Sequence, residues 1–579
     1  MARATPEDYV FLDDQMRGTQ RVFTRPSHII SAHSRADLPA AFQAIDAAQA
    51  KGQWLAGWLS YELGYALEPK FPAPARDTPL LQLGVFNAPS DHAPIDWLYT
   101  RDIPDLVFKP DWTEAEYLAR FEKLQNYIQE GDCYQVNLTF PMRAQSDVTP
   151  AQLYAAFRRR QPGRHGGVVS LGETDIISFS PELFFERSGK NMRMRPMKGT
   201  RPRGQTDDAA IAAAMQAEPK SRAENLMIVD LLRNDLSRLC AAGSVKVPEL
   251  FTLETYPTLH QMTSEVTGEL RSDIHWGDIF RGLFPCGSVT GAPKIRAMEI
   301  IRDLETGPRG AYCGSLGYIA PNGDASFSVA IRTVQMHGGA LRYDVGSGVV
   351  ADSDGPDEYR ECLLKAHILA PQAETAIETF RRLPSGDIPR LDTHLARAAT
   401  AMSVDEAQVT QRLKSLTKID GDQDLRVRLE FSENPSNVSV ITTPYAPLPT
   451  PLRLALSRYP LGPNVQNMRY KSSRRDFYDG ERARLAAQLG VDEVVFANVS
   501  GAICEGSFTS LFVKLDGAWL TPPLTEGILP GVLRAHLIAG GDITERQLCI
   551  DDLRRAEAVQ VGNALRGRLD AVFIDYLTH

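Results

Sequence analysis

The sequence predicts an α+β fold, because β-rich and helix-periodic stretches are mixed without the regular alternation of βαβ units. The β-rich stretches are "GGVVSLGETDIISFS" (166–180), "GSLGYIAP" (314–321), "FSVAIRTVQM" (327–336) and "LRYDVGSGVV" (341–350). The helix-periodic stretches are "EAEYLARFEKLQNYIQEG" (114–131), "AENLMIVDLLRNDLSRLC" (223–240), "APKIRAMEIIRDLE" (292–305) and "PDEYRECLLKAHILA" (356–370). In the second of these helices the predicted apolar stripe is Leu226, Val229, Leu232 and Leu236.

A chain of 579 residues is long enough for two or more domains. A break is predicted near "LAPQAET" (369–375), where a helix ends at a proline. After it, "ETFRRLPSGDIPRLDTHLARAATAMS" predicts a strand, a tight turn at Ser385 and Gly386, a second strand and a helix. We therefore expect a large domain at residues 1–370 and a smaller one at residues 371–579.

The composition is that of a soluble globular protein, with 43% hydrophobic and 23% charged residues. The net charge of −9 argues against nucleic acid as the main partner. The seven cysteines are scattered without a CxxC pair, which argues against a disulfide framework or a zinc site and is typical of a reducing cytosol. The N-terminus is acidic where a signal peptide needs an apolar core, and no apolar run approaches the ~18 residues of a membrane helix. We therefore expect a cytoplasmic protein that does not span a membrane.

Carboxylates stand out in otherwise apolar segments of the N-terminal region. Glu182 follows a proline at a predicted strand edge, and Glu224 lies near the start of a predicted helix. Glu358 and Glu361 are three residues apart, which places both on one face of a helix. Carboxylates from two helices suit Mg²⁺, which takes oxygen ligands and usually keeps waters and a ligand anion. Ordinary solvated helix charges are the alternative interpretation of the same spacing.

Eight motifs occur in an order that resembles one enzyme family. The N-terminal region is similar to the chorismate-utilising enzymes, which include anthranilate synthase component I, aminodeoxychorismate synthase component I, and the isochorismate and salicylate synthases. The similarity runs from about Gly57 to about Leu369 and rests on "EGDCYQVNLT", "SFSPELFFE", "PMKGTRPRG", "AENLMIVDLLRNDLSR", "LFPCGSVTGAPKIRAMEII", "GAYCGSLGYI", "SVAIRT" and "GSGVVADSDGPDEYRECLLKA". It implies a large fold of antiparallel sheets with flanking helices, and a Mg²⁺-dependent site for chorismate.

The resemblance implies a role for each matching residue. Glu224, Glu358 and Glu361 correspond to the carboxylates at the Mg²⁺. Arg332 and Tyr312 correspond to the residues that hold the carboxylate of the enolpyruvyl side chain, a task that suits a planar guanidinium. The other implied candidates are Gly346 and Gly348, whose backbone N–H groups approach the substrate, Lys365, which contacts it, His260, the active-site histidine, and Glu182, the general acid.

Lys198 distinguishes two reactions within this family. Its stretch "RMRPMKGTRPRG" (193–204), taken alone, is typical of a basic surface loop. However, "PMKGT" resembles the "PIKGT" of aminodeoxychorismate synthases, whereas anthranilate synthases have "PIAGT". The Lys198 amine would attack C2 of chorismate and expel the C4 hydroxyl, after which ammonia would attack C4 and expel the lysine. We expect repulsion from Arg193, Arg195, Arg201 and Arg203 to keep Lys198 neutral. Ammonia would come from a separate glutamine amidotransferase subunit or from free ammonium.

The C-terminal region resembles the fold-type IV pyridoxal-phosphate enzymes, which include class IV aminotransferases and 4-amino-4-deoxychorismate lyase. The similarity rests on "K-S-S-x-R", "G-x-D-E", "N-x-x-G", "E-G-S", "T-P-P" and "G-I-L-P-G" in this order. It implies that Lys471 carries the cofactor and moves protons, and that Glu505 pairs with the pyridine nitrogen. The implied phosphate-binding residues are Arg397, Val532, Leu533, Asn563 and Ala564.

Together the two regions predict a bifunctional transferase and lyase of 4-aminobenzoate and folate biosynthesis, with Mg²⁺ and pyridoxal phosphate as cofactors. Three alternatives stay open. The N-terminal domain could be an anthranilate or isochorismate synthase. The C-terminal domain could be an amino acid aminotransferase, or an inactive docking module for the amidotransferase. The resemblance is also compatible with a homodimer through the C-terminal domain.

Overall fold

The computed structural model describes residues 8–72, 78–91, 93, 106–158, 160, 163–202, 208–255, 259–369, 375–402, 423–431, 438–461, 471, 475–498 and 500–576. The chain forms two compact units. The first comprises Met1–Leu98 and Asp102–Pro371, and the second comprises Tyr99–Arg101 and Gln372–His579.

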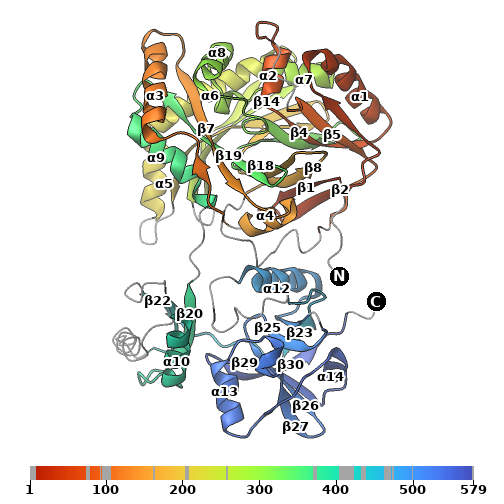
Figure 1. Ribbon diagram of the computed structural model, residues 1–579, viewed down its shortest axis with the longest axis vertical. Coiled ribbons are helices and arrows are strands. Elements are labelled where there is room, and N and C mark those ends of the chain that lie inside the picture. Colours follow the sequence, from red (N-terminus) through yellow and green to blue (C-terminus); the bar gives the residue numbers. More distant parts are fainter. Residues whose placement is uncertain are drawn as a thin grey trace. The chain divides into compact units, whose positions relative to one another are not determined.

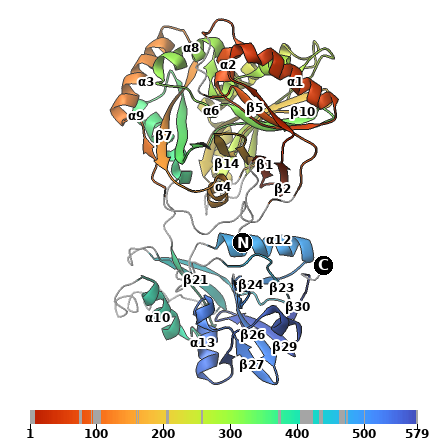
Figure 2. The ribbon, with the colours of Figure 1, turned by 45° about the vertical axis from the view of Figure 1, so that its right-hand side comes forward.

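Two antiparallel sheets form the frame of the first unit (Figures 1 and 2). Among the described residues, the first sheet has nine strands in the order β15-β7-β19-β18-β9-β8-β1-β2, with β6 beside β7. The second sheet has ten strands in the order β12-β14-β11-β10-β17-β16-β4-β5-β3, with β13 beside β14. Every neighbouring pair is antiparallel, so the expected α+β class with antiparallel sheets is confirmed.

The strands of the first sheet are β1 (Tyr9–Asp14), β2 (Thr19–Thr24), β6 (Lys109–Pro110), β7 (Gln135–Gln145), β8 (His165–Ser170), β9 (Asp175–Ser180), β15 (Gly291–Ala292), β18 (Thr333–His337) and β19 (Ala340–Val350). Those of the second are β3 (His28–Ala32), β4 (Trp54–Leu59), β5 (Leu81–Phe86), β10 (Leu183–Ser188), β11 (Asn191–Arg195), β12 (Met197–Pro202), β13 (Lys246–Thr255), β14 (Leu259–Glu269), β16 (Ser315–Ile319) and β17 (Ala325–Val329). The helices are α1 (Leu38–Ala50), α2 (Glu62–Leu67), α3 (Glu114–Gln129), α4 (Pro150–Phe157), α5 (Asp208–Ala217), α6 (Pro219–Ser237), α7 (Trp276–Leu283), α8 (Lys294–Leu304) and α9 (Gly355–Lys365).

The two sheets pack face to face around a shared apolar core. One buried cluster joins Val10 and Phe23 of the first sheet to Trp58 and Phe86 of the second. Each sheet therefore removes the inner face of the other from water. The indole of Trp58 is fully buried, and its Nε1 donates to Gln82 Oε1 at 3.1 Å, since a buried indole N–H needs an acceptor.

Helices α3 and α9 lie side by side at one edge of this frame (Figures 1 and 2). A capping box begins α3: Thr113 Oγ1 accepts from the Glu116 backbone N–H at 3.3 Å, and Glu116 Oε2 accepts from that of Thr113 at 2.8 Å. Helix α9 begins at Asp354, whose side chain accepts from the backbone N–H of Asp357. Because α9 packs on β19, it carries Glu358 to the strand that contains the two predicted substrate glycines.

The predicted apolar stripe of α6 is wrong at its first residue. Leu226 is 46% exposed, and the buried face instead includes Asn225, whose Oδ1 accepts from Ser264 Oγ at 2.5 Å. The other buried apolar residues of this face are Ile228, Val229, Leu232 and Leu236. The stripe is therefore as expected at Val229, Leu232 and Leu236, and differs only at its N-terminal end, which a buried polar pair occupies.

The β-rich stretch at 327–336 forms two strands in different sheets rather than one. Strand β17 belongs to the second sheet and β18 to the first. Between them Arg332 adopts a left-handed backbone conformation with φ of 53°. Such a conformation costs a non-glycine residue about 1 kcal/mol or more and persists only where the surroundings hold it. Arg332 therefore lies where the chain crosses from one sheet to the other.

The second unit contains two sheets among its described residues. One has three antiparallel strands in the order β20-β21-β22, and the other is mixed, with eight strands in the order β25-β24-β23-β30-β29-β26-β27-β28. Helix α10 covers the small sheet, and α12 and α13 pack on the large one. The elements are β20 (Ala376–Arg382), α10 (Leu391–Met402), β21 (Leu425–Phe431), β22 (Val438–Pro444), β23 (Leu452–Leu456), α12 (Asp476–Leu489), β24 (Glu493–Ala497), β25 (Ile503–Gly506), β26 (Ser510–Leu515), β27 (Ala518–Thr521), α13 (Val532–Ala539), β28 (Thr544–Glu545), α14 (Ile550–Arg554), β29 (Ala558–Asn563) and β30 (Gly567–Phe573).

The second strand expected after Ser385 and Gly386 is absent from residues 383–390, which form turns instead. The tight turn itself is present, because the Gly386 N–H donates to Leu383 O at 2.9 Å. Pro389, on the far side of the turn, has no backbone N–H to donate to a strand ladder. Strand β20 pairs with β21 instead, about forty residues along the chain.

The seven cysteines are free thiols, six of them buried. None of the described helices combines the length and the apolar character that crossing a bilayer requires.

Candidate active sites

Lys198 lies where the two sheets of the first unit face each other. It is half-buried on β12 of the second sheet. A methyl group added to Gly348 of β19, in the first sheet, would lie 3.4 Å from Lys198 Nζ and 3.1 Å from Gln135 Nε2. The Lys198 amine therefore borders strands of the opposite sheet, unlike the solvated lysine that the basic stretch alone suggests.

Glu182 lies between β9 and β10 and is 5% exposed. Its Oε1 accepts from Ser288 Oγ at 2.7 Å. Burial raises the pKa of Glu182 to about 7, although the Ser288 hydrogen bond and the positive charge of Lys198 oppose the shift. A carboxyl group with this pKa holds or releases a proton near neutral pH, which is what a general acid requires.

A second group of charges surrounds the C-terminal half of α9. Lys365 Nζ lies 2.6 Å from Glu361 Oε1 and donates to Gly346 O at 2.9 Å. Burial opposes ionisation of Glu361, but the charges of Lys365, Lys198 and Arg332 outweigh it and lower the pKa of Glu361. The structure thus brings Lys198, Arg332 and Lys365 around one ionised carboxylate next to β19.

The three carboxylates expected at a metal do not form a preassembled cluster. Glu358 Oε1 accepts from Ser353 Oγ at 2.7 Å, and Glu361 is ion-paired with Lys365. Glu224 is half-buried on α6, which packs on β14 and β12. Across the described ranges, no group of three or more His, Cys, Asp and Glu side chains lies close enough to hold a metal ion.

Two further residues implied by the resemblance are buried, Tyr312 in the turn before β16 and His260 near the start of β14. Tyr312 is 4% exposed, and burial raises its pKa well above the usual range, so its hydroxyl stays protonated. His260 on β14 is 2% exposed, and its Nε2 lies 2.7 Å from Asp208 Oδ1 of α5.

Two of the arginines next to Lys198 are ion-paired. Arg193 is ion-paired with Glu186 and Glu265, at 3.0 and 2.9 Å. Arg195 is ion-paired with Glu249 and Glu254, at 3.1 and 2.8 Å. These four carboxylates face the positive charges of Arg193 and Arg195, so this part of the loop is not the purely basic cluster that the sequence suggests. The side chains of Arg201 and Arg203 lie outside the described residues.

Gln135 is a candidate residue that the sequence analysis did not single out. Its side chain is fully buried, and neither its Nε2 nor its Oε1 has a hydrogen-bond partner within the described part of the chain. A buried amide without partners is uncommon and expensive. Its position beside Gly348 and Lys198 identifies it as a polar group available to a ligand. The sequence signal was its place in "YQVNLT", but local sequence could not reveal that it lacks partners.

The second unit contains a cavity of about 460 Å³ that collects every candidate residue predicted for it. Basic and polar side chains from both sheets of the second unit line the cavity. The predicted residues among its lining are Arg397, Lys471, Glu505, Val532, Leu533, Asn563 and Ala564.

Lys471 lines this cavity and is half-buried. Its Nζ donates to Thr379 Oγ1 at 3.4 Å, and its carbonyl accepts from the Ile377 N–H of β20 at 2.6 Å. Burial, reinforced by the charges of Arg475 and Arg397, lowers the pKa of Lys471 to about 7. The amine is therefore largely neutral just above neutral pH and can act as a nucleophile or a base.

Glu505 and the N-terminus of α13 lie on other walls of the cavity. Glu505 Oε1 accepts from Tyr478 OH, and its Oε2 accepts from the Leu529 N–H, both at 2.9 Å. Helix α13 begins at Val532 after Gly531, and both residues are part of the cavity lining. The first free N–H groups of the helix therefore favour an anion in the cavity.

Arg397 is held by a buried carboxylate that the sequence analysis missed. Glu378 of β20 accepts from Arg397 Nε at 2.7 Å and Nη2 at 2.8 Å, and from His394 Nδ1 at 2.7 Å. His394 is 1% exposed and lines the cavity, and its Nε2 has no partner among the described residues. The spacing of His394 and Arg397 by three residues on one helix was visible in the sequence, but Glu378 joins them only through the fold.

Residues 7–371 match the family of chorismate binding enzymes, and residues 375–572 match the class IV amino-transferases. The chain is 40% identical over 276 residues to aminodeoxychorismate synthase component 1 of Escherichia coli, which covers 47% of this chain and 61% of the relative. It is 39% identical over 271 residues to anthranilate synthase component 1 of Methanothermobacter thermautotrophicus, and this alignment covers 46% of this chain and 58% of that relative. The solved structure of anthranilate synthase component I from Streptococcus pneumoniae matches with a TM-score of 0.54 at 23% identity, covering 64% of this chain and 93% of that one, and shows the fold alone.

The chain thus spans about three fifths of the length of these two relatives. Their nearly equal identities do not separate one reaction from the other, so the distinction rests on individual side chains.

The lowered pKa predicts how Lys471 reacts. Labelling of lysines with an amine-selective acylating reagent, followed by mass spectrometry, should show Lys471 reaching half its maximal rate near pH 7. The exposed Lys190 is the internal control and is labelled in the same sample. A profile for Lys471 that matches the Lys190 profile would contradict the electrostatic description of the cavity.

Proposed function

The chain belongs to the chorismate binding enzymes, and on that premise we propose that it converts chorismate and ammonia to 4-amino-4-deoxychorismate and then to 4-aminobenzoate, a precursor of folate. The observation that carries the proposal is the position of Lys198. It is a half-buried amine that borders Gly348 and Gln135 and acts electrostatically on Glu182 and Glu361.

In the first reaction, the Lys198 amine forms a bond to C2 of chorismate while both ring double bonds shift and the C4–O bond breaks. Glu182 donates its proton to the departing hydroxyl, which leaves as water. Ammonia then bonds to C4, both double bonds shift back, the C2–N bond to Lys198 breaks, and a proton of the new C4 ammonium group returns to Glu182. The lysine is regenerated, and the product is chorismate with an amino group in place of the C4 hydroxyl.

Mg²⁺ would be held by Glu224 and Glu361, with Glu358 nearby. The donor set is all carboxylate, and Glu361 is ionised, which fits a hard cation. Its contribution would be to neutralise a carboxylate of the substrate.

Ammonia is proposed to come from a separate glutamine amidotransferase. The name of the Escherichia coli relative, component 1, implies a second component for that protein. Free ammonium salts should replace it in the assays below.

The residues of the second unit fit pyridoxal phosphate. The cavity combines a half-buried lysine of lowered pKa, a carboxylate, an arginine and a helix N-terminus. His394 Nε2, which has no partner among the described residues, leaves one more polar group for a ligand. Lys471 would hold the cofactor, Glu505 would face its ring nitrogen, and Arg397 with the start of α13 would hold its phosphate. The cofactor supplies an electron sink when bound. Lys471 would then move a proton on the substrate as pyruvate is eliminated.

Replacement of Lys198 tests the first reaction. With chorismate, Mg²⁺, pyridoxal phosphate and ammonium, the wild type should form 4-aminobenzoate, and Lys198→Ala should reduce this to background because the C2 adduct cannot form. Lys190 is an exposed lysine in the turn between β10 and β11, so Lys190→Ala is the matched control and should keep full activity. Anthranilate as the product, with a rate that Lys198→Ala leaves unchanged, would instead assign the first unit as an anthranilate synthase.

The pKa of Glu182 predicts the pH dependence of amination. Glu182 must be protonated to donate, so kcat/KM for chorismate should fall as the pH rises through about 7 when free ammonia is held constant. Glu182→Gln should lower kcat by about a hundredfold and abolish this fall, because glutamine does not titrate. A Glu182→Gln variant that retains the wild-type pH profile would remove Glu182 from the role of general acid.

Replacement of Lys471 tests the second reaction. Lys471→Ala should stop 4-aminobenzoate formation and cause 4-amino-4-deoxychorismate to accumulate, as measured by chromatography, whereas Lys514→Ala on β26 should behave as wild type. Transamination of a branched-chain or D-amino acid without 4-aminobenzoate would assign an aminotransferase. A wild-type protein that shows no visible absorbance with added pyridoxal phosphate would indicate an inactive docking module.

A further inference from the structure

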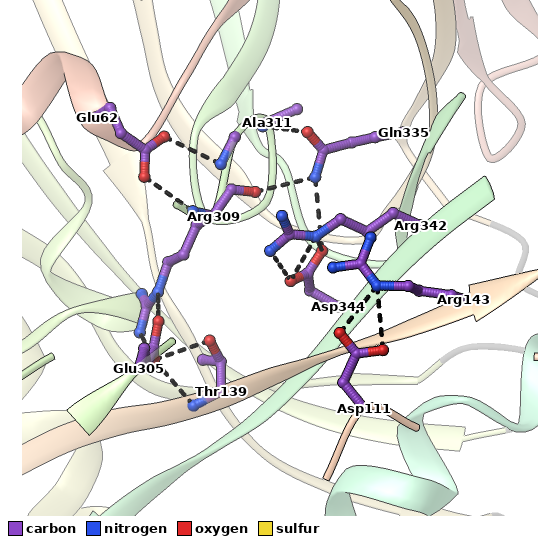
Figure 3. Close-up of polar contacts among 11 residues, drawn as sticks. Glu62, Asp111, Thr139, Arg143, Glu305, Arg309, Ala311, Gln335, Arg342 and Asp344 are labelled. Atoms are coloured by element: carbon purple, nitrogen blue, oxygen red, sulfur yellow. Dashed lines mark hydrogen bonds and ion pairs between the residues drawn. The ribbon is translucent and has the colours of Figure 1, made fainter. Parts of the chain in front are cut away.

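Arg309 is a fully buried cation at the centre of the first unit. It is 2% exposed and lies in the segment between α8 and β16. Its Nε donates to Glu305 Oε2 at 2.9 Å and its Nη2 to Glu305 Oε1 at 2.7 Å (Figure 3). Burial opposes the charge, but Glu305 holds the pKa of Arg309 well above its usual range. An ion pair this deeply buried is stable only when its remaining polar atoms are also bonded.

The remaining bonds of Arg309 reach two other segments of the chain. Nη2 also donates to Asn137 O of β7 at 2.7 Å, and Nη1 donates to Val289 O at 3.2 Å. Val289 follows Ser288, the residue that donates to the Glu182 carboxylate. One guanidinium therefore ties the strand that begins at Gln135 to the segment that positions Glu182.

The backbone around Arg309 is clamped from both sides. Glu62 of α2 accepts from the N–H of Arg309 at 2.8 Å and from that of Gly310 at 3.0 Å. Opposite it, Gln335 of β18 donates to Arg309 O and accepts from the Ala311 N–H, both at 2.9 Å (Figure 3). Four backbone bonds thus fix the three residues that lead directly into Tyr312.

Glu305 extends the same network to the substrate strand. Its Oε1 accepts from the Thr139 N–H at 3.0 Å and from Thr139 Oγ1 at 2.8 Å. Thr139 pairs with Gly346 across β7 and β19, and a methyl group on Gly346 would lie 2.4 Å from Thr139 Cγ2. The Thr139 side chain therefore packs directly against Gly346.

We propose that Arg309, with the carboxylates of Glu305 and Glu62, positions Tyr312, Gly346 and Glu182 for chorismate. The inference rests on the proposed function of the first unit, because this hydrogen-bond network would hold the chorismate site in place. None of the three charged residues touches the reacting atoms. They act through the side chains and backbone that do, so they are positioning residues.

Glu62→Gln is the sharpest test, because it keeps size and burial but places an amide NH₂ against a backbone N–H. One clamp bond is lost, and the segment before Tyr312 loosens. Arg309→Lys is the second variant, since an ammonium cannot reproduce the forked bonds to Glu305, Asn137 and Val289. The matched control is Asp13→Asn, which weakens an equally buried ion pair between Asp13 and Arg158. Asp13 is on β1, which lies five strands away from β7 in the first sheet.

Chorismate binding is measured by titration calorimetry without ammonia, alongside KM, kcat and the melting temperature. Both test variants should raise the chorismate Kd and KM by about tenfold, the equivalent of one charge-assisted hydrogen bond, with a smaller change in kcat. Asp13→Asn should lower the melting temperature and leave Kd and KM within about twofold of wild type. If Glu62→Gln lowers the melting temperature as Asp13→Asn does but leaves Kd unchanged, the network is merely structural and the inference is wrong. A wild type that does not bind chorismate overturns the proposed function itself, and this inference with it.

Discussion

The pairing of β7 with β19 is the constraint on which the first site depends. The two strands pair over eleven residues each, from Ala340 opposite Gln145 to Val350 opposite Gln135. Within this ladder, Gly346 and Gly348 leave space that side chains would fill, and Lys198 approaches from the other sheet at the second of these glycines. Because side chains alternate along a strand, a register shift of one residue would turn Gln135 away from the site. The strand register thus determines which polar groups meet the lysine.

Burial produces the reactive groups of both units. It raises the pKa of a carboxyl group, Glu182, and lowers that of an amine, Lys471, and in each case the result is about 7. The cause is the same, since removal from water disfavours whichever form is charged. Neither site therefore needs an unusual residue type to hold or release protons near neutral pH. In each unit, a common residue type is sufficient once the fold removes its ionisable group from water.

The ion pairs around Lys198 show where electrostatic reasoning from sequence is weakest. A run of basic residues predicts mutual repulsion, but Arg193 and Arg195 each contact carboxylates that arrive from β10, β13 and β14. The sequence positions of those glutamates, up to about seventy residues away, give no local sign of this compensation. The same is true of Glu62, which is 247 residues from the Arg309 backbone that it holds.

Local sequence was sufficient wherever the determining interactions are short-range. The class of the fold and the helices at 114–131 and 356–370 could be predicted, because residues within a few positions of each other determine the hydrophobic periodicity of a helix. The tertiary structure alone decided the roles of Gln135, Glu305 and Glu378, and the division of residues 327–336 between two sheets. These features depend on which hydrogen-bond partners a buried polar atom has. Such partners come from distant segments of the chain, so they are determined only when those segments pack together.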